Sequence, residues 1–242
     1  MSSRNSKADK RGPIASWQSV AAIIDHTNLR PEATPDQIIR LCEEAREFGF
    51  GAVMVNPCYI RLAASNLQDS EVKVGAVVGF PLGATLTSVK IFETKEALKL
   101  GAREIDMVLN IGALRAGNRA LVLSDISGVA DVVCEQRALL KVILETGLLA
   151  KEEKLAACEI SEQAGAAFVK TCTGFLGGVA TVEDVRLMRG AVKIGVKASG
   201  GIRTASDARA MIDAGASRLG TSSGVNIIRE LRAQTENDAS SR

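Results

Sequence analysis

Short apolar runs alternate along the chain with longer amphipathic stretches, and this rhythm predicts alternating strands and helices. We predict strands at Ala22–Asp25, Ala52–Val55, Val72–Val78, Glu104–Leu109, Leu139–Leu144, Phe168–Cys172, Ile194–Ala198 and Arg218–Thr221. We predict helices at Thr34–Phe48, Tyr59–Leu67, Ser88–Leu100, Asn118–Gln136, Lys151–Ala164, Val182–Met188, Ala205–Ala214 and Val225–Ala233. Turn residues support these boundaries, because Thr34-Pro35 is typical of a helix start and glycine follows several helices.

Repeated strand–helix units of this kind predict an α/β fold with a parallel sheet. Eight units in about 220 residues, or about 27–30 residues each, match a single (β/α)8 TIM barrel. The alternative is an open doubly wound sheet, which normally carries a Gly-rich turn after its first strand. Here the Gly-rich turns follow the seventh and eighth predicted strands, so the barrel is favoured. We expect the barrel to span 17–234, between loose tails at 1–16 and 235–242.

Composition narrows the class of protein further. Of 242 residues, 46% are hydrophobic but only 3% are aromatic, so the core must be aliphatic. A net charge of +2 favours neither nucleic acid nor a membrane as partner, and no apolar run reaches the roughly 18 residues of a membrane span. Five cysteines without disulfide spacing, and an N-terminal segment without the apolar run of a secretory signal, indicate a cytoplasmic protein.

Two lysines lie in segments that are otherwise apolar. Lys170 stands in 166–174 and Lys197 in 193–201, each near the C-terminal end of a predicted strand and one βα unit apart. Barrel enzymes place catalytic groups at those strand ends. Burial and a second cation both favour the neutral amine, which can attack a carbonyl carbon. The pair therefore predicts imine chemistry, with Lys170 as nucleophile and Lys197 as the second cation. The alternative is that each lysine extends outward to a surface carboxylate.

Other charged residues in apolar strands are candidates for the same site. Asp106 should pair with the inward lysines, since a lone buried carboxylate is costly, and it could move protons as a carbinolamine loses water. A plain buried ion pair is the alternative. Lys141 either orients or polarises the substrate, or pairs with Glu145 or another carboxylate. Asp25 either hydrogen-bonds substrate or lysine neighbours, or forms an Asx turn.

Two glycine-rich loops predict an anion site. They are 199–204 and 220–224, and each leads into a predicted helix. Backbone N–H groups, hydroxyl groups and a helix N-terminus together favour phosphate, and barrels often bind phosphate after strands seven and eight. The alternative is two ordinary capped loops. The single histidine, His26, argues against a histidine-built metal site, and we interpret it as structural; Cys172 is interpreted as a small buried thiol.

With these residues in view, the chain resembles the deoxyribose-phosphate aldolase family of class I aldolases from Asp25 to Gly224. The resemblance depends on motifs in one order and spacing: Asp25-His-Thr, Val78-Gly-Phe-Pro-Leu-Gly83, Glu104-Ile-Asp-Met-Val108, Leu140-Lys-Val-Ile-Leu-Glu-Thr146, Phe168-Val-Lys-Thr-Cys-Thr-Gly-Phe175, Val196-Lys-Ala-Ser-Gly-Gly-Ile-Arg203 and Gly220-Thr-Ser-Ser223. It implies a TIM barrel that reversibly cleaves 2-deoxy-D-ribose 5-phosphate to D-glyceraldehyde 3-phosphate and acetaldehyde. It also implies no metal, no cofactor, sugar phosphates and aldehydes as ligands, and a homodimer or higher homo-oligomer.

The resemblance also implies roles for individual residues. Lys170 matches the Schiff-base lysine, Lys197 the lysine that perturbs it, and Asp106 the proton-transfer aspartate, while Asp25 and Lys141 match supporting pocket residues. The phosphate-binding loops correspond to Gly174, Gly200, Gly201, Arg203, Gly220, Ser222 and Ser223.

The chain departs from the family pattern at three places. Met54 replaces a cysteine of many members, Phe175 replaces a lysine of some, and the C-terminal tyrosine of some members is missing, since Tyr59 is the chain's only tyrosine. Phe175 leaves more of the phosphate binding to Arg203 and backbone groups. The competing interpretations are a Schiff-base barrel aldolase for another sugar phosphate and a non-catalytic phosphate-binding barrel.

Overall fold

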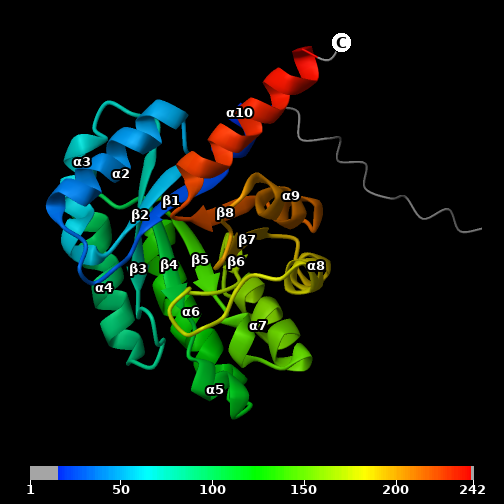
Figure 1. Cartoon of the computed structure of the whole chain (residues 1–242). Coiled ribbons are helices and arrows are strands. Elements are labelled where there is room, and N and C mark those ends of the chain that lie inside the picture. The colour runs from blue at the N-terminus through cyan, green and yellow to red at the C-terminus, as the bar shows by residue number, and fades with distance from the viewer. Residues whose placement is uncertain (1–15, 241–242) are drawn as a thin grey trace, which may run out of the picture.

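Eight parallel strands close into a barrel in the computed structural model, which describes residues 16–240 and the side chains of 16–235 (Figure 1). Each strand pairs with the next and β8 pairs with β1, while the helices surround the barrel. The strands are β1 (Ile24–Asn28), β2 (Ala52–Val55), β3 (Lys73–Val78), β4 (Glu104–Val108), β5 (Leu139–Ile143), β6 (Phe168–Lys170), β7 (Gly195–Ser199) and β8 (Arg218–Thr221). The predicted (β/α)8 barrel is confirmed.

The helices follow the strands along the chain, and local sequence explains where several begin. Thr34 caps α2 by accepting from the Gln37 N–H, and Thr204 caps α9 in the same way through Asp207. The helices are α1 (Trp17–Ala21), α2 (Pro35–Phe48), α3 (Ile60–Asn66), α4 (Thr87–Lys99), α5 (Ile111–Arg115), α6 (Arg119–Glu135), α7 (Lys151–Gln163), α8 (Val182–Ala191), α9 (Ala205–Asp213) and α10 (Gly224–Ser240), with 3-10 turns η1 (Pro57–Tyr59) and η2 (Thr146–Leu148).

The structure differs from the predicted elements mainly near the ends of the barrel domain. The strand predicted at Ala22–Asp25 begins two residues later and runs over Ile24–Asn28, because Ala22 and Ile23 form the turn that follows the short helix α1, which Ser16 caps. The short helix α5, capped by Asn110, was not predicted. Helix α10 continues to Ser240 and so occupies most of 235–242, which we expected to be a loose tail. Residues 1–15 of the other expected tail lie outside the described residues.

Strand register sets which interior side chains are neighbours. Lys170 on β6 is the register partner of Lys197 on β7, and Asp106 on β4 is the partner of Lys141 on β5. All four side chains are buried, as is Asp25 on β1. Parallel pairing therefore brings charged residues from distant parts of the sequence into one layer of the barrel interior.

The outer shell contains a second buried ion pair, which joins two helices to the barrel. Lys90 on α4 donates to Asp125 Oδ2 on α6 at 2.5 Å and to the Val108 carbonyl oxygen at the end of β4 at 2.9 Å.

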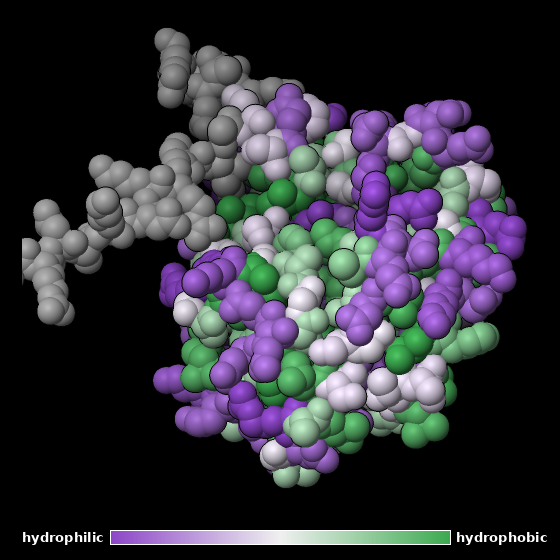
Figure 2. All heavy atoms as spheres, turned by 180° about the vertical axis from the view of Figure 1, so that it is seen from behind, coloured by the Kyte–Doolittle hydropathy of each residue, from purple (hydrophilic) through white to green (hydrophobic). Residues whose placement is uncertain are grey.

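On the molecular surface, hydrophilic and apolar side chains are interspersed over the face shown in Figure 2. None of the helices between Ser16 and Ser240 has the length and apolar character that crossing a membrane requires.

Candidate active site

A pocket of about 730 Å³ opens at the C-terminal ends of the strands. Its wall comes from α2 and from the exits of β1, β6, β7 and β8. Lys170 and six of the seven predicted phosphate-loop residues line it: Gly174, Gly200, Gly201, Arg203, Gly220 and Ser222. The seventh, Ser223, does not line the pocket, and its N–H donates to Thr221 Oγ1 at 2.9 Å.

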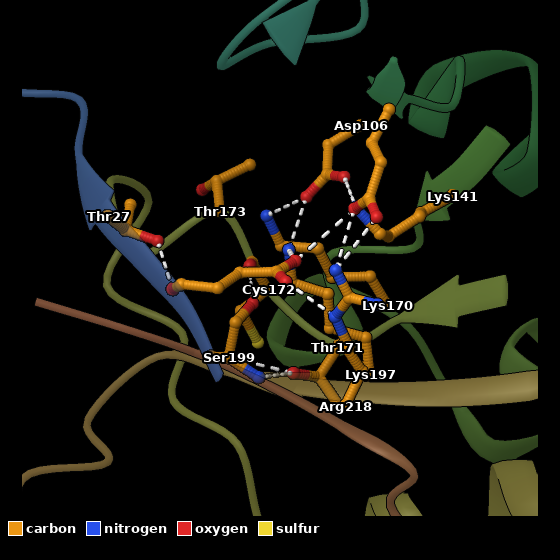
Figure 3. A network of polar contacts seen from close by, with 12 residues as sticks. Thr27, Asp106, Lys141, Lys170, Thr171, Cys172, Thr173, Lys197, Ser199 and Arg218 are labelled. Atoms are coloured by element: carbon orange, nitrogen blue, oxygen red, sulfur yellow. Dashed lines mark hydrogen bonds and ion pairs between the residues drawn. The ribbon is translucent and has the colours of Figure 1, made fainter. Parts of the chain in front are cut away.

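Asp106 lies beneath the pocket and accepts hydrogen bonds from three lysines (Figure 3). Its Oδ2 atom accepts from Lys170 Nζ and Lys197 Nζ, each at 2.8 Å. Its Oδ1 atom accepts from Lys141 Nζ at 2.8 Å. The outward orientation considered for the lysines is therefore wrong. Lys141 does not pair with Glu145, but the expected pairing with another carboxylate is confirmed, since it pairs with Asp106. One carboxylate links the three amines.

Two further carboxylates and an arginine complete this layer. Asp25 accepts from Lys197, and its other oxygen lies 2.5 Å from Arg218 Nε. Glu104 lies 2.5 Å from Lys141 Nζ and 2.8 Å from an Arg218 nitrogen. Because both oxygens of Asp25 face cations, the Asx-turn interpretation of this residue is wrong. We call the seven residues the barrel cluster: Asp25, Glu104, Asp106, Lys141, Lys170, Lys197 and Arg218.

Burial and neighbouring charges move proton affinities within the cluster in opposite directions. Burial lowers the pKa of Lys197 to about 8: Asp106 and Asp25 raise this pKa, but they do not offset the loss of water, to which the positive charges of Lys141 and Lys170 add. Burial acts on Lys141 too, but Asp106, Asp25 and Glu104 outweigh it and raise its pKa above the ordinary range. Burial would raise the pKa values of Asp25 and Asp106, yet the surrounding cations hold both below their ordinary value. Burial therefore weakens the hold of Lys197 on its proton, whereas Lys141 holds its proton more firmly than an exposed lysine does.

Access to the pocket distinguishes the three lysines. Lys141 and Lys197 are fully buried, whereas Lys170 is 3% exposed and lines the pocket. A molecule in the pocket can therefore reach the amine of Lys170 without passing the other two. This arrangement places a reachable amine above a buried cation and a shared carboxylate, which suits attack on a carbonyl carbon followed by proton transfer.

Gly220 makes room for Lys197. A Cβ atom on Gly220 would lie 2.9 Å from Lys197 Cε and 2.9 Å from Ser199 Cβ, closer than carbon atoms normally approach. Gly220 is the register partner of both Asp25 and Ser199. Predicted only as a phosphate-loop residue, it also provides the space through which the lysine reaches Asp25 and Asp106.

The loop after β6 is held by Glu145, a residue to which sequence reasoning gave only a possible pairing with Lys141. Glu145 Oε2 accepts from the N–H of Thr173 at 3.0 Å and from its hydroxyl at 2.5 Å. The Thr173 hydroxyl in turn accepts from the Phe175 N–H at 3.1 Å. Glu145 is buried and has a positive φ of 56°, uncommon for a residue other than glycine. This contact fixes the segment in which Thr173 and Gly174 line the pocket.

The two predicted helix N-termini at the phosphate loops differ. At α9, Asp207 Oδ2 accepts from the N–H groups of Arg203 and Thr204, each at 3.0 Å, and Glu230 accepts from the Ala205 N–H at 2.7 Å. These amides are occupied by the protein's own carboxylates. The first turn of α10 contains no acidic residue, so its positive end remains suited to an anion beside Ser222.

The remaining candidates have structural contacts. His26 Nε2 lies 2.7 Å from Glu44 Oε2 and its ring packs 5.0 Å from that of Phe50, while burial lowers its pKa. Cys172 is buried, in agreement with its interpretation as a small buried thiol, and burial raises its pKa. The side chains described, those of residues 16–235, include no group of His, Cys, Asp and Glu placed to hold a metal ion. The expectation of an enzyme without metal or cofactor stays a prediction.

A family model described as DeoC/LacD family aldolase matches residues 19–230. The chain belongs to this family. The family predicted from the motifs is thereby confirmed, and the protein is an aldolase.

Individual relatives agree with this assignment. The aldolase is 56% identical over 185 residues to a deoxyribose-phosphate aldolase of Halalkalibacterium halodurans, a match covering 75% of this chain and 82% of that one. It is 57% identical over 178 residues to a deoxyribose-phosphate aldolase of Streptococcus gordonii, covering 73% and 80%. The solved structure of a tetrameric deoxyribose phosphate aldolase from Aeropyrum pernix superposes with a TM-score of 0.85 at 33% identity, over 90% of this chain and 93% of that one.

Proposed function

We propose that this aldolase reversibly cleaves 2-deoxy-D-ribose 5-phosphate to D-glyceraldehyde 3-phosphate and acetaldehyde through a Schiff base on Lys170. The observation that carries the proposal is the position of Lys170, the cluster lysine that lines the pocket, within reach of the predicted phosphate loops. Relatives more than 50% identical over most of the chain bear the name of this activity. We also propose that the enzyme acts in the cytoplasm as a homo-oligomer, supported by the tetrameric relative.

The first chemical steps form the imine. The neutral Lys170 amine attacks C1 of the open-chain aldehyde, and the carbinolamine loses its hydroxyl group as water when a proton is supplied to that oxygen. Asp106, 2.8 Å from Lys170 Nζ, relays this proton, and Lys197 shares the same carboxylate oxygen. The positive Lys197 favours the neutral form of its neighbour. Lys141 and Asp25 hold Asp106 and Lys197 in place.

Carbon–carbon cleavage follows from the positive imine nitrogen. The C3 hydroxyl gives its proton to water in the pocket and becomes the aldehyde carbonyl, the C2–C3 bond breaks, and the electron pair of that bond forms the enamine with Lys170. Glyceraldehyde 3-phosphate leaves. Protonation of the enamine at C2 and addition of water release acetaldehyde and restore the amine. The electron pair of the broken C2–C3 bond becomes the C1–C2 double bond of the enamine, and the positive imine nitrogen takes back the electrons of its own double bond to C1.

The substrate phosphate is bound by the loops after β7 and β8. Gly200 and Gly201 have positive φ values of 103° and 79°, which glycine adopts without strain, and both line the pocket with Arg203 and Ser222. The N-terminus of α10 and the Arg203 guanidinium supply positive charge. Phe175 also lines this wall, and it can offer apolar contact but no charge to the phosphate.

Covalent trapping tests the proposal directly. The protein is incubated with acetaldehyde and cyanoborohydride, digested, and the modified peptide is mapped. We expect a single label on Lys170 and none in the Lys170→Met variant. Labelling at another lysine, or cleavage of a different sugar phosphate in preference to 2-deoxyribose 5-phosphate, would replace the proposed nucleophile or substrate.

A further inference from the structure

The barrel cluster contains more cations than carboxylates. Lys141, Lys170, Lys197 and Arg218 face Asp25, Glu104 and Asp106, so four positive groups meet three negative groups when all are ionised. These residues come from β1, β4, β5, β6, β7 and β8. The remaining two strands, β2 and β3, contribute no buried charged side chain, since β2 is wholly apolar and the one charged residue of β3, Lys73, is exposed.

Arg218 lies on the side of the cluster away from substrate. It is absent from the residues that line the pocket, and a Cβ atom on Gly51, just before β2, would lie 3.5 Å from its Cζ atom. It therefore sits at the N-terminal end of the barrel. Its Nε atom binds Asp25, and its terminal nitrogen binds both oxygens of Glu104, at 2.8 and 3.0 Å.

An unbalanced positive charge is costly in the barrel interior, and loss of one proton removes it. Arginine keeps its proton at any ordinary pH. Lys141 is held in its charged form by three carboxylates, which raise its pKa. The proton is therefore lost from the pair that shares Asp106 Oδ2, namely Lys170 and Lys197.

We propose that Arg218 and Glu104 are positioning residues that set the net charge of the barrel cluster, and through it the pH range in which a lysine amine is free to attack. This inference depends on the proposed imine chemistry at Lys170. Neither residue reaches the substrate pocket, so their effect passes through Asp25 and Lys141.

Charge counting gives opposite expectations for the two residues. Arg218→Gln leaves three cations and three carboxylates, so every lysine can keep its proton. The pH midpoint of imine formation should then rise by about one unit or more, a loss of about tenfold in neutral amine at pH 7. Glu104→Gln leaves four cations and two carboxylates, so the midpoint should fall by a similar amount. The double variant has three cations and two carboxylates, which restores the surplus of one, and its midpoint should return toward wild type.

The experiment measures the rate of acetaldehyde trapping by cyanoborohydride at Lys170 from pH 5 to 9, with the label located by peptide mapping. Arg218→Lys is the conservative control, because it keeps the charge and should keep the midpoint. Thermal unfolding of each variant separates folding defects from shifts in midpoint. If Arg218→Gln does not fold, the charge-setting role is still tested by the other two variants. It requires a lower midpoint in Glu104→Gln and an unchanged midpoint in Arg218→Lys.

Two failures are distinguishable. If the wild type is labelled elsewhere than Lys170, the proposed function fails. If Lys170 is labelled but Glu104→Gln and Arg218→Gln shift the midpoint in the same direction, or leave it unchanged, the charge-setting role is wrong while the proposed function stands. A merely structural role would lower the rate at every pH without moving the midpoint.

Discussion

Lys170 and Lys197 are register partners on neighbouring strands, and both amines donate to the same oxygen of one aspartate at 2.8 Å. Two cations that share a single acceptor repel each other more than two separate ion pairs would. The pair therefore favours the loss of one proton. Because Lys170 lines the pocket and Lys197 is fully buried, the proposed nucleophile and the proposed second cation differ in their access to substrate.

Replacing Lys197 tests this separation of roles. In Lys197→Met the cluster becomes balanced in charge, so we expect trapping at Lys170 to be slowed about 10- to 1000-fold at pH 7, the range that one to three pKa units represent. The reaction should recover as the pH rises. The pH dependence of cyanoborohydride trapping measures this, and Lys193→Met, on the exposed end of a loop, is the matched control. A rate that stays low at every pH would contradict the charge-based role.

Substituting Gly220 tests whether the space it leaves for Lys197 is needed for stability and activity. In Gly220→Ala the new Cβ atom would lie 2.9 Å from Lys197 Cε, so the lysine must shift away from Asp106. We expect about 1–3 kcal/mol of destabilisation from overpacking and a kcat at least tenfold lower. Urea unfolding and steady-state kinetics measure the two effects. Gly190→Ala in α8 is the control, since nothing lies within 4 Å of its added Cβ atom, and it should be neutral or stabilising. An unaltered kcat in Gly220→Ala would mean that the lysine tolerates displacement.

Arg203 tests the phosphate site. The side chain is exposed at the pocket wall, and no substrate group other than the phosphate needs its charge. Arg203→Ala should therefore raise KM for 2-deoxyribose 5-phosphate about tenfold or more, since a charged hydrogen bond contributes about 1.5–3 kcal/mol. The rate with unphosphorylated deoxyribose, which lacks the group that Arg203 is proposed to bind, should be the same in the variant and the wild type. Equal losses with both substrates would show that Arg203 does not bind the phosphate.

The cluster also predicts how folding stability depends on pH. Asp25 and Asp106 have lowered pKa values in the folded protein, whereas unfolded aspartate titrates near 3.9. Their contribution is fully present above that value and is lost as the pH falls through the lowered folded values. In urea unfolding between pH 7 and pH 3, Asp25→Asn should lose about 3–5 kcal/mol at pH 7, and the gap from wild type should narrow with acid. Asp131→Asn, exposed on α6, should run parallel to wild type.

The predicted fold agrees with the structure because interior strands and capped helices leave strong local patterns. β2 and β8 have the predicted bounds, and the spacing of Lys170 and Lys197 by one βα unit placed them on neighbouring strands. Glu104 and Arg218 were not recognised as part of the site. Two-residue alternation puts Glu104 on the same face as Asp106, but the reach of Arg218 depends on strand register, which the sequence does not contain.

Thr173→Val tests the contact that holds the β6 loop. Valine keeps the shape of threonine but removes the hydroxyl, so Glu145 Oε2 loses its 2.5 Å partner and the Phe175 N–H loses its acceptor. Glu145 Oε2 keeps the Thr173 N–H, so the cost is that of one lost hydrogen bond to a charged group, about 1.5–3 kcal/mol, and the loosened loop should raise KM for the sugar phosphate. Thr173→Ser keeps the hydroxyl and should retain both properties. Because Lys170 itself ends β6 before this loop, acetaldehyde trapping at Lys170 should change little in either variant. A loss of trapping in Thr173→Val, with KM unchanged, would instead connect this threonine to the amine.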